Sequence, residues 1–171
     1  MSERAFVALG SNLGDRDAHL AAALAGLRAT PGVSGVACSS IYETAPVGPP
    51  GQGPYLNAVA RVDTTLDPHA LLARLLALER DAGRVRSGVR DEARTLDLDL
   101  LLHGARCLDE PGLTLPHPRL HERAFVLVPL AELAPELVHP RLGRTLAELA
   151  RAASAASPPG AVKLRGRAPA A

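Results

Sequence analysis

The sequence predicts an α+β fold built on an antiparallel sheet, and this expectation depends on three observations. The 171 residues are enough for one domain with a substantial core and too few for two. Hydrophobic residues make up 47% and charged residues 22% of the chain, which is typical of globular rather than disordered proteins. Short apolar runs and helical repeats follow one another in the order strand, helix, strand, strand, helix, strand.

Local signals place each of these elements. The first strand ends at turn-forming residues that lead to a helix-capping Asp15, and Pro31 with Gly32 ends the helix that follows. Proline and glycine dominate the segment 44–54, which is too long for a simple hairpin turn, and loops of this kind often carry function. The predicted elements are strand 5–9, helix 16–29, strand 33–43, strand 55–65, amphipathic helix 68–83 and strand 94–102.

This order is that of the ferredoxin-like βαββαβ fold, an antiparallel sheet with two helices on one face. We therefore expect the opposite face of the sheet to be free for ligands. A C-terminal helical extension should follow, with helices over 124–133 and 146–153. The domain is predicted to span residues 1–153, and residues 154–171, rich in alanine, proline and glycine, are predicted to be a mobile tail.

Composition and charge exclude several classes of function. The formal net charge of +1 gives no general affinity for nucleic acid or an anionic membrane, so anion binding would need local clusters of positive charge. The sequence contains no stretch of about 18 uncharged apolar residues, and we expect a cytoplasmic protein with no membrane partner. We also expect a monomer. Cys38 and Cys107 are isolated, which predicts neither a disulfide nor a zinc site.

Asp97 and Asp99 are the strongest candidates for a functional site. They alternate with leucines, and residues two apart in a strand point to the same face, about 7 Å from each other. Two carboxylates so placed repel each other unless a cation lies between them, and oxygen ligands suit Mg²⁺ that carries a polyphosphate. The alternative is a half-exposed strand with an acidic outer face. The leucines on the other side are expected to enter the core: Leu96, Leu98, Leu100 and Leu102.

Positive charge gathers at two places in the sequence around these acids. Guanidinium groups bind phosphate oxygens through two parallel hydrogen bonds and keep their charge, so both clusters favour a triphosphate site. The alternative is a local salt-bridge network in which Arg94 neutralises Asp97, although such a network would not require the second cluster. The first cluster contains Arg84, Arg86, Arg90 and Arg94, with Glu79 before it, and the second contains His117, Arg119, His121 and Arg123.

Tyr55 and Asn57 indicate a site for a flat heterocycle. They lie two residues apart after the loop 44–54, so a strand would place a stacking ring beside an amide that both donates and accepts hydrogen bonds. Packing at an edge strand and a turn-side hydrogen bond remain the alternatives for these two residues.

Several short motifs together resemble the 6-hydroxymethyl-7,8-dihydropterin pyrophosphokinase family of folate biosynthesis. The resemblance covers residues 4–150 in order, and the run Arg-Thr-Leu-Asp-Leu-Asp-Leu is its most specific part. The motifs are Gly10-Ser11-Asn12-Leu13-Gly14, Tyr42-Glu43-Thr44-Ala45-Pro46, Tyr55-Leu56-Asn57, Gly83-Arg84-Val85-Arg86, Arg94-Thr95-Leu96-Asp97-Leu98-Asp99 and Pro116-His117-Pro118.

The resemblance implies a ferredoxin-like enzyme that transfers pyrophosphate from ATP to the hydroxymethyl group of the pterin and releases AMP. It implies two Mg²⁺ ions held by Asp97 and Asp99, and catalytic roles for these two residues, Arg84 and Arg94. The implied ATP contacts are with the phosphates for Arg84, Arg86, Arg94, His117 and Arg123, and near the nucleoside for Glu79 and Thr114. The implied pterin contacts are hydrogen bonds from Thr44, the backbone at Val47 and Asn57, and stacking on Tyr55 and Phe125.

Two further expectations concern details of the reaction. We hypothesise that Asp97, or a water molecule on the metal, accepts the proton of the pterin alcohol. Many members of the family carry a Trp-Gly-Pro-like segment in the lid over the ligands, where this chain has Asp91-Glu92-Ala93. We therefore expect lid closure to depend on contacts of Arg84 and Arg86 with phosphate, and Arg90 to point to solvent.

Two other classes of protein share parts of this pattern. A metal-dependent nucleotidyltransferase also uses a Gly-Ser turn and paired acids, but its turn lies close before the acids, whereas Gly10 and Ser11 are far from Asp97 in the sequence. A non-catalytic ferredoxin-like binding module for RNA would present aromatic rings and basic residues on the sheet rather than acids. Release of AMP, release of pyrophosphate, or neither would distinguish the three.

Overall fold

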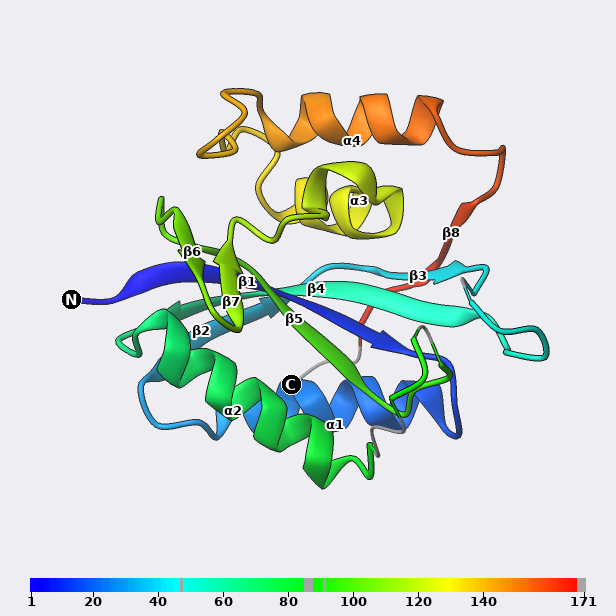
Figure 1. The fold of residues 1–171 in the computed structure, drawn as a ribbon, viewed down its shortest axis with the longest axis horizontal. Coiled ribbons are helices and arrows are strands. Elements are labelled where there is room, and N and C mark those ends of the chain that lie inside the picture. The colour runs from blue at the N-terminus through cyan, green and yellow to red at the C-terminus, as the bar shows by residue number, and fades with distance from the viewer. Residues whose placement is uncertain (47, 85–87, 91, 169–171) are drawn as a thin grey trace.

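The chain folds into a sheet between two layers of helices (Figure 1). The computed structural model describes residues 1–46, 48–84, 88–90 and 92–168. Within these residues, no helix has the length and apolar character needed to cross a membrane. The elements are β1 Glu3–Ser11, α1 Arg16–Arg28, β2 Val33–Cys38, β3 Ile41–Thr44, β4 Tyr55–Thr64, α2 Pro68–Asp81, β5 Asp97–His103, β6 Leu108–Glu110, β7 Leu113–Leu115, a 3₁₀ turn Leu120–Glu122, α3 Ala124–Leu133, α4 Leu146–Ala155 and β8 Val162–Gly166.

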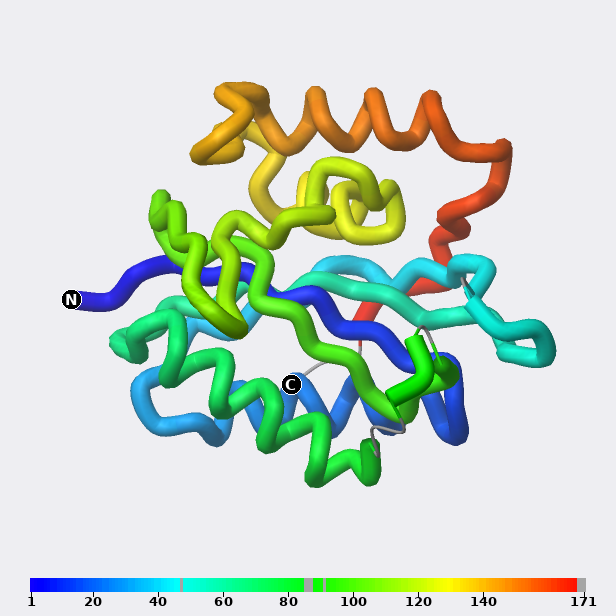
Figure 2. The backbone as a smooth tube through the Cα atoms, in the orientation of Figure 1, coloured from blue at the N-terminus to red at the C-terminus, as the bar shows by residue number. Residues whose placement is uncertain are grey.

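The main sheet is antiparallel and has the strand order β5-β1-β4-β3-β8, with β2 also paired to β4. The tube in Figure 2 shows β1 running through the middle of the molecule beside β5 and β4. The α+β class and the antiparallel sheet are therefore confirmed. A second, two-stranded sheet is formed by β6 and β7.

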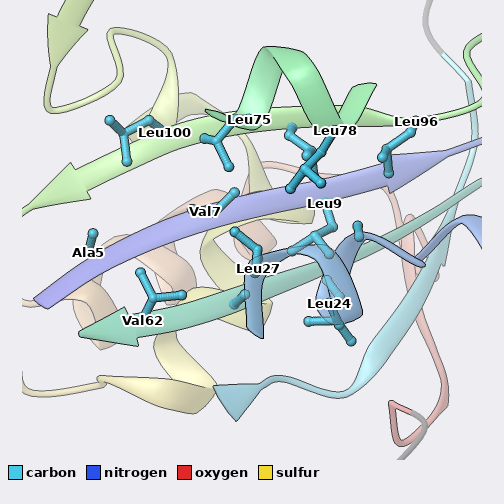
Figure 3. Close-up of a cluster of buried hydrophobic side chains, with 14 of the residues drawn as sticks. Ala5, Val7, Leu9, Leu24, Leu27, Val62, Leu75, Leu78, Leu96 and Leu100 are labelled. Atoms are coloured by element: carbon cyan, nitrogen blue, oxygen red, sulfur yellow. The ribbon is translucent and has the colours of Figure 1, made fainter. Parts of the chain in front are cut away.

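Helices α1 and α2 cover one face of the sheet, as the βαββαβ order predicts. Asp15 caps α1 by accepting a hydrogen bond from the backbone of Ala18, and Asp67 caps α2, whose first residue is Pro68. Figure 3 shows the core between these helices and the sheet, in which leucines of α1 and α2 meet side chains of β1 such as Val7. Burial of these apolar side chains is the main force that holds this layer together.

Helices α3 and α4 cover part of the other face, which corrects the expectation that this face is free for ligands. The sequence of α3 is apolar on nearly all sides, so the helix must be buried against both the sheet and α4. A second core results, formed by Phe6 and Val59 from the sheet and by leucines of the two helices, such as Leu127 and Leu149. Only the part of the face that these helices leave uncovered remains for ligands.

A β-bulge divides the leucines of β5 between the two cores. Phe6 of β1 lies opposite Leu102, whereas the next residue lies opposite Leu100, so Leu101 is the extra residue. Before the bulge, the leucines enter the core under α1 and α2, as expected. After it, Leu102 faces the second core together with Leu101, because the bulge reverses the alternation of the strand. The expectation that Leu102 shares a core with Leu100 is therefore wrong.

The segment 33–43 forms two strands, β2 and β3, rather than one. At the break, the Ser39 hydroxyl accepts a hydrogen bond from the Val59 backbone nitrogen at 2.9 Å, in the place of a backbone carbonyl. The chain therefore leaves the ladder at Ser39 and joins it again at Ile41. This break turns β3 toward β8.

The described part of the C-terminal segment, for which the composition predicts a mobile tail, contains regular elements. Helix α4 extends to Ala155, and Val162–Gly166 forms β8, which adds to the free side of β3. Arg165 of β8 forms an ion pair with Asp17 of α1, with 2.9 Å between Nη2 and Oδ2. The segment has a defined place at the edge of the sheet because its partners lie far away in the sequence, where composition gives no signal.

Glu132 ties α3 to β3. Its carboxylate accepts hydrogen bonds from the backbone nitrogen of Ser40 at 2.9 Å, the Ser40 hydroxyl at 2.8 Å and the Tyr42 hydroxyl at 2.7 Å. Burial favours the neutral acid, but these hydrogen bonds outweigh it and hold the pKa of Glu132 below its usual range. The bonds therefore stabilise the fold only while this carboxylate is ionised.

Replacement of Glu132 by glutamine should lower the melting temperature at pH 7 by about 2 °C, because hydrogen bonds to a charged acceptor become neutral ones. A folded-state pKa below the unfolded value gives stability that is present above the unfolded value and lost as the pH falls. The gap between wild type and Glu132→Gln should therefore shrink as the pH falls below 4.5, the ordinary value for this carboxyl. Scanning calorimetry from about pH 7 to about pH 3, a range that includes the titration of carboxyl groups, measures this difference in melting temperature. Glu136→Gln, at another exposed carboxylate nearby, is the control. A gap between wild type and Glu132→Gln that stays constant with pH would contradict the role of Glu132.

Candidate active site

One row of side chains runs across the sheet on the face that α3 and α4 partly cover. Asp97 of β5 lies opposite Gly10 of β1, Gly10 lies opposite Asn57 of β4, and Asn57 lies opposite Tyr42 of β3. Residues that lie opposite each other in antiparallel strands share a face, so the register itself brings this row together. Asp99 lies on the same face, two residues after Asp97.

A cavity of about 760 Å³ opens above this row. Its walls come from the sheet, the polar turn before α3, the start of α3 and the segment after α4. The lining includes Gly10, Thr44, Tyr55, Asn57, Arg90, Arg94, Asp97, Asp99, His117, Arg119, Arg123, Phe125 and residues 157–162. Most of the residues that the sequence singles out are therefore brought to one place.

Asp97 is held by two arginines. Its Oδ1 accepts a hydrogen bond from Arg84 Nη1 at 2.9 Å, and its Oδ2 lies 2.9 Å from Arg94 Nη1. The salt-bridge network considered as an alternative for Arg94 is thus present in this structure. It does not exclude phosphate binding, because Arg94 also lines the cavity.

Asp99 differs from Asp97 in its contacts. Neither a hydrogen bond nor an ion pair reaches it from the residues that the structure describes. Burial and the negative charge of Asp97 raise the pKa of Asp99 to about 6. A divalent cation between the two carboxylates would relieve both effects, so this donor pair fits Mg²⁺. No group of three or more acidic, histidine or cysteine side chains suited to a metal occurs in the described part of the chain, so most ligands of such an ion would be phosphate and water oxygens.

Glu79 supports the site from below the sheet. It is only 2% exposed, accepts a hydrogen bond from the Leu98 backbone nitrogen at 2.8 Å and pairs with Arg84. It thereby fixes both the start of β5 and the guanidinium that contacts Asp97. Glu79 does not line either cavity described here, so the contact with the nucleoside implied by the resemblance stays a prediction.

A second cavity of about 320 Å³ adjoins the first, and Asp99 and His117 line both. Thr114 lines this second cavity together with Leu72 and Leu100. Thr114 and His117 therefore lie next to the paired acids, although their segment of the sequence is separate from them.

His117 is a neutral group in this site. Burial and the nearby charge of Arg123 lower the pKa of His117 to about 4, so the ring is uncharged at pH 7. Its backbone nitrogen bonds to the Leu101 carbonyl at 2.9 Å, and its Nδ1 accepts from the Arg119 backbone nitrogen at 3.2 Å. The second basic cluster therefore supplies its charge through arginines, and His117 contributes a hydrogen-bonding ring rather than a cation.

The cavity is also lined by uncharged polar and aromatic groups. Asn57 Nδ2 donates a hydrogen bond to Thr44 Oγ1 at 2.6 Å, which leaves the amide oxygen available. Tyr55 and Phe125 line the cavity beside this pair, and the Arg123 guanidinium lies 5.6 Å from the centre of the Phe125 ring. Two ring-bearing residues and an amide in one cavity agree with the heterocycle site predicted from sequence.

Four further residues singled out in the sequence fall into two groups. Val47 and Arg86 lie outside the described residues, and so does Asp91 of the predicted lid. Arg90 is exposed, as expected, but it also lines the cavity.

Two contributors to the site are not evident from sequence reasoning. Asn12 accepts a hydrogen bond from the Arg94 backbone nitrogen at 2.7 Å and donates to Gln52 Oε1 at 2.9 Å, which joins the loop 44–54 to the arginine. Gly10 leaves room for the ring-binding groups, because a Cβ there would lie 3.2 Å from Asn57 Oδ1 and 3.5 Å from Tyr55 Cδ1. The only signal for either was their place in a turn-like motif.

The fold and the residues gathered in this cavity agree with one class of enzyme, the ATP-dependent pyrophosphokinases. Residues 6–135 match the family model described as 7,8-dihydro-6-hydroxymethylpterin-pyrophosphokinase (HPPK). The chain belongs to this family.

Relatives with the name 2-amino-4-hydroxy-6-hydroxymethyldihydropteridine pyrophosphokinase agree with this. The chain is 48% identical to that of Methylorubrum extorquens over 135 residues, which cover 79% of this chain and 85% of the relative. It is 48% identical to that of Pseudomonas aeruginosa over 149 residues, 87% of this chain and 91% of the relative.

Solved structures agree in fold. The wild-type Plasmodium falciparum HPPK-DHPS with pteroate superposes with a TM-score of 0.69 at 13% identity, over 89% of this chain and 44% of that chain. This chain thus spans less than half the length of that protein, and at this identity the likeness shows the fold alone.

Proposed function

We propose that this chain transfers the diphosphate group of ATP to the hydroxymethyl group of 6-hydroxymethyl-7,8-dihydropterin and releases AMP, a step of folate biosynthesis. The names of its family and relatives describe this activity. The observation that carries the proposal is one cavity with two chemically different ends. Asp97 and Asp99 on β5, with Arg94, form its charged end, whereas Asn57 and Tyr55, two strands away on β4, form its neutral end, and Phe125 also lines the cavity.

The pterin would occupy the neutral end. Its ring would lie between Tyr55 and Phe125, and the polar edge of the ring would exchange hydrogen bonds with Asn57, Thr44 and the backbone at Val47. This placement directs the hydroxymethyl group toward the paired acids.

The triphosphate would occupy the charged end. Attack of the alcohol on the β-phosphorus breaks the bond to the oxygen that joins the α- and β-phosphates, so negative charge grows on the departing AMP. Arg94 and Arg123 line the cavity there, and Arg84 reaches Asp97. Guanidinium groups in these positions stabilise that charge through hydrogen bonds. His117 would contact the phosphates, and Thr114, which lines the second cavity with it, would lie near the nucleoside.

Asp97 and Asp99 would hold two Mg²⁺ ions, which when bound supply positive charge to the phosphates and align them for transfer. Both oxygens of Asp97 contact arginines in this structure. We propose that Arg84 and Arg94 move from Asp97 to the phosphates when ATP binds, which leaves the carboxylate for the metal and for the proton of the alcohol. Arg86 would join them as a phosphate contact.

We further propose that the enzyme acts as a monomer in the cytoplasm. The described residues to which we assign a role line the two cavities of a single chain or, in the case of Arg84, contact Asp97 at the first cavity. ATP and the pterin are then its only required small-molecule partners.

The test is the product formed from ATP. Purified protein with Mg²⁺ and ATP should release AMP only when the reduced hydroxymethylpterin is added, and the pterin diphosphate should appear in equal amount by chromatography. Release of pyrophosphate instead would indicate nucleotidyl transfer. If neither AMP nor pyrophosphate were formed, the protein would be a binding module. Either result would reject the proposal.

Gly10→Ala tests the neutral end of the cavity. The added Cβ would lie 3.2 Å from Asn57 Oδ1, which must then shift, so the KM of the pterin should rise about fivefold for a packing cost of about 1 kcal/mol. The KM of ATP should change little, because the three atoms nearest to the added Cβ belong to Asn57 and Tyr55 and not to Asp97. Gly53→Ala is the control, since a Cβ there meets only the Asn12 carbonyl oxygen at 3.8 Å. Equal effects of Gly10→Ala on both KM values would contradict the placement of the pterin.

A further inference from the structure

The segment 157–166 lies beyond the residues that match the family model, which end at 135, and yet it forms one side of the cavity. Its first part, residues 157–162, connects α4 to β8 and contributes six lining residues. Figure 1 shows this segment descending from the end of α4 to the edge of the sheet. None of these residues takes part in the reaction steps proposed above.

The register of β8 places this segment next to the pterin end of the cavity. Val162 lies opposite Thr44, and Leu164 lies opposite Tyr42. Opposite residues share a face, so the Val162 side chain stands beside the Thr44 hydroxyl that bonds to Asn57. None of the residues 157–162 lines the second cavity, where Thr114 lies.

Contacts at both ends hold the segment in place. The β8 strand pairs with β3 over four residue pairs, and Arg165 bonds to Asp17 of α1 through two contacts of 3.2 Å and 2.9 Å. At the other end the segment continues from α4, which packs on α3. A surface ion pair alone stabilises little, so the strand pairing is the main attachment.

The chemistry of the segment differs from that of the opposite end of the cavity. Its lining residues carry no charge: Ser157, Pro158, Pro159, Gly160, Ala161 and Val162. Such a surface suits the edge of an uncharged ring and offers no positive charge to a phosphate. Prolines and strand pairing also reduce its freedom, so it can limit the size of what binds.

We propose that residues 157–162 are a specificity-determining wall of the pterin site, which bounds the ring at the end away from the phosphates. This inference depends on the proposed function, because it assigns the wall to the same substrate. It predicts that a large side chain on the cavity face of the wall excludes the pterin and leaves ATP binding intact.

Val162→Trp and Leu164→Trp form a matched pair for the test. The two residues lie on the same face of β8, but Val162 lines the cavity, whereas Leu164 is 67% exposed and does not. For Val162→Trp we expect the KM of the pterin to rise about tenfold, as overpacking of a site does, and the KM of ATP to stay within about twofold. For Leu164→Trp we expect both KM values to match those of the wild type. Titration calorimetry of the pterin with each variant, in the presence of an unhydrolysable ATP analogue and Mg²⁺, should repeat the difference in affinity.

Hydrogen exchange of the β8 amides shows whether the new side chain fills the cavity or displaces the strand. In either case the wall is altered, and the KM of the pterin should rise. An unchanged KM of the pterin in Val162→Trp, or an equal rise in Leu164→Trp, would overturn the proposed role of residues 157–162. Either result would leave the proposed function intact. A wild-type protein that neither binds nor converts the pterin would overturn both.

Discussion

Replacing Asp97 and Asp99 together by asparagine should lower kcat by about a thousandfold, because the amides cannot hold the cations that neutralise the phosphates. The Mg²⁺-dependent part of the ATP affinity should be lost as well. The fold should survive, since Asp97 is only partly buried and amides can still accept hydrogen bonds from Arg84 and Arg94. Titration calorimetry of ATP with and without Mg²⁺ measures the affinity, and AMP release measures kcat.

Asp109→Asn is the control for this double variant. Asp109 also pairs with an arginine, Arg141, at 2.8 Å, but it is exposed and lies outside both cavities. Its replacement should leave kcat and ATP affinity unchanged. If the double variant kept a normal Mg²⁺-dependent affinity for ATP, the assignment of the metal site to these acids would be wrong.

Glu79→Gln should produce the largest loss of stability among the substitutions considered. It removes one partner of a buried ion pair and leaves the Arg84 guanidinium with Asp97 alone, which should lower the free energy of unfolding by about 3 kcal/mol. The glutamine can keep the hydrogen bond from Leu98, so the loss should stay at the lower end of the range for buried pairs. Urea unfolding measures the loss.

The activity of Glu79→Gln shows whether Glu79 positions Arg84 for the reaction or only stabilises the fold. Under conditions where the variant is fully folded, kcat should still fall, because Arg84 and the start of β5 lose a common anchor. Glu110→Gln is the matched control, since Glu110 pairs with His69 on the exposed surface and should cost no more than about 0.5 kcal/mol. A folded Glu79→Gln with normal kcat would limit Glu79 to a structural role.

Local signals were enough to predict much of the fold. The helices α1 and α2 follow from caps and leucine spacing, and the alternation of Asp97 and Asp99 with leucines places both acids on one face of a strand. These features depend only on near neighbours in the chain, which is why the sequence alone reveals them.

Features that depend on distant partners could not be predicted in this way. The bulge at Leu101 exists because of the register with β1, and β8 exists because β3 leaves an edge open. Likewise, the bond from Arg94 to Asn12 joins residues 82 apart in the sequence. The neutral state of His117 is another case, since it comes from burial by elements that no local pattern places there. The roles of the individual site residues remain predictions.

One row of opposed residues across the sheet has a fixed length. It runs from Asp97 through Gly10, Asn57 and Tyr42 to Leu164. Neighbouring strands are about 4.8 Å apart, so four intervals set about 19 Å between its two ends. Backbone hydrogen bonds fix that length more firmly than any side chain could. In the proposed function, a heterocycle and a chain of phosphates would lie end to end along this row, and the spacing of the strands would set how far apart their binding groups are held.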